Sequence, residues 1–121
     1  MGSALLQCWL DHQIISKAII IEPNDIPATL SQYEAIAHLK TKPEQPLGCD
    51  VLVLAVKPQI MSNVCADIMP FVGNNTLILS IAAGQNIEKL QSYFKTSQPI
   101  IRSMPNTPAA IGKGISVAVP N

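Results

Sequence analysis

Four short apolar runs divide the chain, and each is followed by residues that favour turns. Continuous apolar runs of this length, rich in Val and Ile, are typical of strands that are buried on both faces. A further segment, residues 115–119, alternates in hydrophobicity and predicts a last strand at a sheet edge. The buried strands are predicted at residues 18–21, 51–56, 76–81 and 99–102.

Apolar residues spaced three or four positions apart predict helices between these strands. Asn24 or Asp25 can cap the second helix and Asn86 the fourth, and Pro58 stands at the start of the third. The helices are predicted over residues 3–10, 26–37, 58–69 and 87–94. Two segments rich in polar residues or proline, 41–48 and 104–108, are predicted as loops.

The alternation of strands and helices predicts the fold class. Strands separated by helices of this length indicate βαβ units, and therefore an α/β fold with a Rossmann-like, doubly wound and mostly parallel sheet. A length of 121 residues favours a single domain.

Composition excludes several classes of protein. Charged residues make up 13% of the chain, against about 25% in an average protein, and the formal net charge is zero. A neutral chain with a pI near 6.7 argues against nucleic-acid binding. No apolar run approaches the roughly 18 residues of a membrane span. The low charge predicts that some faces of the protein are covered by an oligomeric partner or by further sequence.

The three cysteines, Cys8, Cys49 and Cys65, form no CxxC pair and no zinc pattern. Their odd number and wide spacing favour a reduced, cytoplasmic compartment. Cys8 and Cys65 fall on apolar helix faces, which predicts unreactive thiols in the core. We expect no metal site, and the sequence contains no Ser-His-Asp set or paired carboxylates.

Candidate chemistry lies just after the predicted strands, because ligands of open α/β sheets bind outside the carboxyl ends of the strands. Small residues and prolines there let a flat ligand approach the backbone, although each segment taken alone is equally explained as a turn. The segments are Glu22-Pro23-Asn24, Lys57-Pro58, Ala82-Ala83-Gly84 and Met104-Pro105-Asn106.

Glu22 lies 20 residues after Gly2. In dinucleotide-binding folds an acid about 20 residues beyond the glycine motif bonds the ribose hydroxyls of NAD, and it would repel the 2′-phosphate of NADP. The alternative is a solvated turn glutamate. For Lys57 and Arg102 two positions stay open. Each would either lie over a phosphate or ribose of the cofactor or point to water. His12 and His38 are isolated, and we expect surface or helix-end positions for both.

Four segments carry a more specific pattern. They are Met1-Gly2-Ser3-Ala4-Leu5-Leu6, DVLVLAVKPQIM at 50–61, LSIAAG at 79–84 and IRSMPNTPAAIGKG at 101–114. In this order and spacing they resemble the nucleotide-binding part of pyrroline-5-carboxylate reductase, and the resemblance covers essentially all 121 residues.

The resemblance also implies neighbouring segments. The family opens with a strand and a GxGxMG turn, so Gly2 resembles the third glycine, which permits close packing of helix on strand. It continues into a helical domain that forms the dimer and most of the substrate-carboxylate pocket. We therefore expect residues 1–121 to be a partial dinucleotide-binding domain that lacks the first strand and the helical domain. Met1 would then be an internal methionine of a homo-oligomeric enzyme.

Site residues follow from the resemblance alone. No catalytic residue is assigned, but Asn106 and Thr107 would border the reacting centre. The cofactor, NADP or NAD, would lie against Gly2, Ser3, Glu22, Asn24, Ala55, Val56, Lys57, Pro58, Ala82, Ala83, Gly84 and Asn106. Glu22 departs from the Ser, Thr or Arg often found in the family, which favours NAD.

The resemblance implies a reductase that transfers a hydride from NAD(P)H to 1-pyrroline-5-carboxylate and so forms L-proline. Such a reaction needs orientation and exclusion of water more than a nucleophile or metal. We expect the isolated chain to be inactive. Two alternatives stay open, namely a non-catalytic remnant and another nucleotide-binding domain of the β-hydroxyacid-dehydrogenase type.

Overall fold

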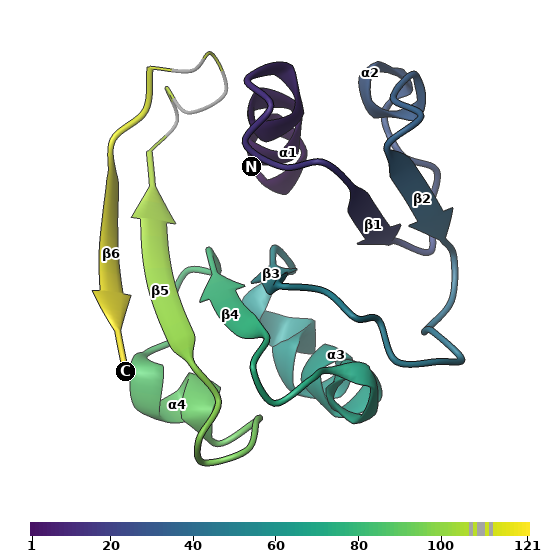
Figure 1. Cartoon of the computed structure of the whole chain (residues 1–121). Coiled ribbons are helices and arrows are strands. Elements are labelled where there is room, and N and C mark those ends of the chain that lie inside the picture. Colours follow the sequence, from purple (N-terminus) through teal and green to yellow (C-terminus); the bar gives the residue numbers. More distant parts are fainter. Residues whose placement is uncertain (107, 109–110, 112) are drawn as a thin grey trace. The chain divides into compact units, whose positions relative to one another are not determined.

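The computed structural model describes residues 1–106, 108, 111 and 113–121 (Figure 1). Internal contacts divide the chain into two compact units. The first contains Met1–Lys42 and Thr107–Ile115, and the second contains Pro43–Asn106 and Ser116–Asn121.

Residues 1–42 of the first unit form two α-helices and a small parallel sheet. Its elements are α1 (Gly2–Asp11), β1 (Ala18–Ile21), α2 (Ala28–Ser31) and β2 (Ile36–Leu39). The strands β1 and β2 pair in parallel from Ala18 opposite Ile36 to Ile21 opposite Leu39. The hydroxyl of Tyr33 donates a hydrogen bond to Asp11 at the end of α1. This bond links the turn after α2 to the first helix.

The predicted helix over 26–37 is wrong. Only Ala28–Ser31 is helical, and Ile36–Leu39 is a strand. The helix ends early because side chains bond its carbonyl groups: Ser31 Oγ donates to Ala28 and Gln32 Nε2 donates to Thr29. Pairing with β1 then draws the apolar residues beyond the turn into the sheet, which overrides their helical spacing.

The second unit contains a four-stranded sheet in the order β3-β4-β5-β6. The first three strands are parallel, and β6 runs antiparallel to β5. A 3-10 turn, Pro58–Ile60, leads into α3, and another, Met69–Phe71, follows it. The remaining elements are β3 (Val51–Leu54), α3 (Met61–Ile68), β4 (Leu77–Ser80), α4 (Ile87–Gln91), β5 (Ile100–Pro105) and β6 (Ser116–Pro120).

The core of the second unit lies on one face of this sheet. Alternation along the strands places four buried residues, Leu54, Ile78, Ser80 and Ile100, on that face. The helices supply four more buried side chains, and α4 contacts β5. These helix residues are Met61, Cys65, Ile68 and Leu90. The opposite face is more open, since Val51 is 44% exposed.

Most predicted elements of this unit are confirmed, although β3, β4 and α4 end earlier than predicted, at Leu54, Ser80 and Gln91. The largest difference is at β5. The strand continues past Arg102 to Pro105, because β6 pairs with its outer half from Ser103 opposite Ala118 to Pro105 opposite Ser116. The predicted loop at 104–108 is therefore wrong for its first two residues. Asn106 follows the strand, and the predicted site residue Thr107 lies outside the described residues.

Candidate functional site

The carboxyl ends of β3 and β4 meet at one edge of the second unit. Leu54 pairs with Ser80, and Ser80 pairs with Arg102, so these three residues form one row across the parallel strands. The predicted segment Ala55–Pro58 follows Leu54 directly, and Ala82–Gly84 begins two residues after Ser80. The structure thus brings these two segments to the same edge, as the fold class requires.

Asn106 does not share this row. It follows Pro105, which lies three residues past Arg102 on β5, or roughly 10 Å farther along an extended strand. Sequence reasoning missed this because the register of β6, which sets the length of β5, is not visible in the local pattern.

The turn after β4 is built from small residues. Ala82 is buried, and its N–H donates to Ser80 Oγ over 3.4 Å. Gly84 has φ +67°, and a Cβ placed there would meet nothing within 4 Å. The open space beside Gly84 leaves its backbone accessible, but the left-handed conformation strains any other L-residue. Two residues after Gly84, Asn86 caps α4 by accepting from the Lys89 N–H over 2.9 Å.

The two basic side chains near this edge differ in burial. Lys57 is exposed at the start of the 3-10 turn. Arg102 is half-buried, and its Nε is buried without a hydrogen-bond partner among the residues that the structure describes. The Oε1 of Gln85, just past Gly84, is unpaired in the same sense. The sequence pattern did not single out Gln85, because nothing local marks a glutamine as buried.

In the first unit, Glu22 lies where β1 ends, as predicted. Its N–H donates to Leu39 over 3.0 Å and so extends the pairing with β2. Its Oε1 accepts the Asn24 backbone N–H over 3.0 Å and the Asn24 Nδ2 over 2.8 Å. These two hydrogen bonds, the backbone one foremost, lower the pKa of Glu22 below its ordinary value of 4.5. The carboxyl group is therefore ionised at neutral pH.

Further polar residues surround this turn. Nε2 of His38 lies 2.8 Å from the carbonyl oxygen of Glu22. Lys40 Nζ and Asp25 Oδ1 form an exposed ion pair at 2.6 Å. His38 lies half-buried on β2, so the expected surface or helix-end position is wrong for it. His12 does lie at a helix end, because it is the C-cap residue of α1.

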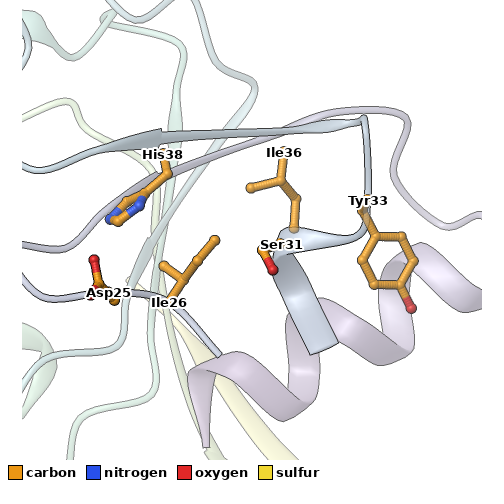
Figure 2. Close-up of a pocket in the computed structure, with 6 residues that line it drawn as sticks. All are labelled: Asp25, Ile26, Ser31, Tyr33, Ile36 and His38. Carbon is orange, nitrogen blue, oxygen red and sulfur yellow. The ribbon is translucent and has the colours of Figure 1, made fainter. Parts of the chain in front are cut away.

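A pocket of about 330 Å³ opens between the 25–31 segment and β2 (Figure 2). Asp25 and His38 flank one end, and Tyr33 lies at the other. This pocket adjoins the Glu22 turn through His38. Part of the pocket wall is formed by β2. The sequence pattern predicted a helix over 26–37 where this strand begins, and so it did not predict the pocket. The lining residues are Asp25, Ile26, Ser31, Tyr33, Ile36 and His38.

Gly2 and Ser3 form the first turn of α1. Its N-cap residue, Met1, makes no side-chain hydrogen bond to the first turn, and the first backbone N–H groups of a helix have no partner within the helix. Such N–H groups attract anions.

The cysteines divide between burial and partial exposure. Cys65 is completely buried in α3, and burial raises the pKa of its thiol to about 11. Cys8 is only half-buried, and α1 contains no buried residue. The predicted core position is therefore correct for Cys65 and wrong for Cys8.

Within 1–106 and the described residues after it, no three His, Cys, Asp or Glu side chains group as metal ligands. The same residues include no helix that is long and apolar enough to cross a bilayer.

Parallel strands, intervening helices and small residues at the strand ends define a nucleotide-binding α/β fold of the Rossmann type. No protein-family model matches the chain. Pyrroline-5-carboxylate reductase of Escherichia coli is 39% identical over 125 residues, which cover 100% of this chain and 46% of the relative. The Haemophilus influenzae reductase is 33% identical over 117 residues, or 96% of this chain and 43% of the relative.

Two solved structures agree. The Plasmodium falciparum pyrroline carboxylate reductase, solved with NADP bound, superposes with a TM-score of 0.83 at 32% identity, over 100% of this chain and 44% of the other. The Coxiella burnetii pyrroline-5-carboxylate reductase has a TM-score of 0.84 at 20% identity, over 99% and 46% of the two chains, and supports the fold alone. The chain is homologous to the amino-terminal part of pyrroline-5-carboxylate reductases and spans less than half the length of these relatives.

Proposed function

We propose that this chain is the dinucleotide-binding part of a reductase that converts 1-pyrroline-5-carboxylate to L-proline with NADH or NADPH. The observation that carries the proposal is the 39% identity to the Escherichia coli reductase over the full length of this chain. The strand-end segments Ala55–Pro58 and Ala82–Gly84, which share one edge of the sheet, support it.

The residues present fit a dinucleotide. In the second unit, Ala82 and Gly84 offer little side-chain bulk at the strand ends, which suits a flat nicotinamide ring. In the first unit, the Gly2 and Ser3 turn of α1 suits a phosphate, and the ionised Glu22 suits a ribose diol. When bound, the dinucleotide supplies the hydride.

The chain's own residues then orient the reactants and exclude water. Orientation alone can contribute roughly 7–11 kcal/mol to lowering a barrier, so the reaction requires no nucleophile from the protein. We assign Asn106 the role of a polar contact at the border of the reacting centre. We also propose that the enzyme is a cytoplasmic homo-oligomer, which is supported by the resemblance and by the separated cysteines.

Titration calorimetry of the purified chain with NADH and with NADPH tests the proposal. We expect saturable binding of at least one dinucleotide without proline formation by the chain alone. Binding of neither would contradict the proposal and favour a non-catalytic remnant.

A chimaera tests the substrate. This chain replaces the homologous amino-terminal part of the Escherichia coli reductase, and oxidation of NADH and NADPH is followed with the cyclic imine and with 3-hydroxy acids. We expect activity with the imine. Turnover of hydroxy acids instead would favour the β-hydroxyacid-dehydrogenase alternative.

A further inference from the structure

Asn24 and Glu22 form a compact clamp at the end of β1. The backbone N–H and the side-chain amide of Asn24 both donate to the same carboxylate oxygen, Oε1, over 3.0 and 2.8 Å. Hydrogen bonds to an ionised acceptor are about twice as strong as neutral ones. Two of them on one oxygen fix the orientation of the carboxylate and leave Oε2 for another donor.

The base of the clamp is also fixed. The Glu22 N–H is held by the Leu39 carbonyl, and the Glu22 carbonyl lies 2.8 Å from His38 Nε2. Both partners belong to β2, so the main chain of Glu22 is part of the sheet. The side chain therefore starts from a rigid position, and Asn24 determines where its charge points.

The neighbouring ion pair makes a lysine less available to bind a phosphate. Lys40, an ammonium group at the end of β2, is paired with Asp25 over 2.6 Å. A 2′-phosphate that approached the turn would thus meet the ionised Glu22, and Lys40 would first have to leave its carboxylate. A ribose diol, in contrast, can donate to Oε2.

We infer that Asn24 is a positioning residue that selects NADH over NADPH by holding the Glu22 carboxylate, without touching the cofactor itself. This inference rests on the proposed function. It differs from the sequence-based expectation that the cofactor lies against both Glu22 and Asn24, because it gives the two residues separate roles.

A double-mutant cycle distinguishes the two arrangements. Dissociation constants for NADH and NADPH are measured by calorimetry for the wild type, Asn24→Ala, Glu22→Gln and the double variant. We expect Asn24→Ala to weaken NADH binding about fivefold, as for the loss of one hydrogen bond, and to change NADPH binding less than twofold. In the Glu22→Gln background, Asn24→Ala should have no further effect.

Two variants sharpen the experiment. Asn24→Asp has the same shape but places a second negative charge against Oε1, so it should weaken NADH binding more than Asn24→Ala does. Asn63→Ala, at an exposed position of α3, is the matched control and should change neither constant. An Asn24→Ala effect that persists without Glu22 would mean that Asn24 touches the cofactor, and this would overturn the inference.

A measurement without cofactor tests the clamp directly. The pKa of the Glu22 carboxyl, followed by NMR, should rise in Asn24→Ala and stay constant in Asn63→Ala. An unchanged pKa overturns the inference even where dinucleotides bind normally. Binding of neither dinucleotide overturns the proposed function and this inference with it, so the two failures are distinguishable.

Discussion

The side-chain amide of Gln98 donates hydrogen bonds to the carbonyl oxygens of Thr76 and Gly73, and both Gln98 and Thr76 are almost completely buried. Gln98 precedes β5, and Thr76 precedes β4. One glutamine just before β5 therefore donates to two carbonyl groups of the segment that leads into β4, and so links the amino ends of these two neighbouring parallel strands.

Replacing Gln98 with Ala should destabilise the protein by about 2 kcal/mol, because the buried Thr76 carbonyl loses the amide donor, whereas the Gly73 carbonyl keeps the Thr76 N–H. Chemical denaturation followed by circular dichroism measures the change. Gln59→Ala, at an exposed position, is the control and should alter stability by less than about 0.5 kcal/mol. An equally small effect of Gln98→Ala would show that water replaces the amide.

Replacing Arg102 with an apolar residue should not destabilise the protein, in contrast to the replacement of Gln98. Its Nε is buried without a partner in the part of the chain that the structure describes, and burying an unpaired polar group costs free energy. Arg102→Met keeps much of the packing and removes this cost, so stability should stay equal or rise by about 1 kcal/mol. The melting temperature tests this, with Arg102→Lys as the charge-preserving comparison. A marked loss in Arg102→Met would reveal an unseen partner.

Most of the fold was predictable from sequence, because the pattern of neighbouring residues is enough to predict most of the helices and strands. Val51 to Leu54 is continuously apolar, Pro58 begins a helical segment, and Asn86 caps α4, all as expected. The helix predicted over residues 36 and 37 was wrong because the apolar spacing there suits a helix as well as a strand. Only the pairing of residues 36–39 with β1 decides between the two.

The places of the candidate site residues in the fold were partly predictable from sequence, and their roles stay predictions. Glu22 was identified because its place after β1 depends on its own neighbours in sequence. The row of Leu54, Ser80 and Arg102 depends on strand register, and the division of roles between Glu22 and Asn24 depends on side-chain distances. Neither register nor side-chain distance can be read from a single sequence.

We expect the protein to lose stability at alkaline pH because the thiol of Cys65 is buried. Burial raises the pKa of its thiol from 9.0 to about 11, so the folded protein keeps a proton that the unfolded chain loses. As the pH rises above 9, the unfolded state binds fewer protons and stability falls, until the change ends near pH 11. A shift of about two units corresponds to roughly 3 kcal/mol.

Urea denaturation at several pH values between 8 and 11 measures this loss. Cys65→Ala should be less stable throughout, since it leaves a cavity, but its stability should fall less steeply with pH. Cys49→Ala, at a half-buried position, should keep the wild-type slope. The same slope in Cys65→Ala would assign the alkaline transition to another group.

Glu22→Ser should shift cofactor preference toward NADPH. The Glu22 carboxyl is ionised at neutral pH because the Asn24 hydrogen bonds hold its pKa below 4.5, and an ionised carboxylate repels a 2′-phosphate. Serine removes that repulsion and can still bond a hydroxyl or a phosphate oxygen. We expect the ratio of the NADPH to the NADH dissociation constant to fall about tenfold, which corresponds to roughly 1.4 kcal/mol. Glu34→Ser, which removes an exposed carboxylate elsewhere in the first unit, controls for net charge and should leave the ratio unchanged. Equal ratios in Glu22→Ser and Glu34→Ser would remove Glu22 from the cofactor site and leave it a solvated turn residue.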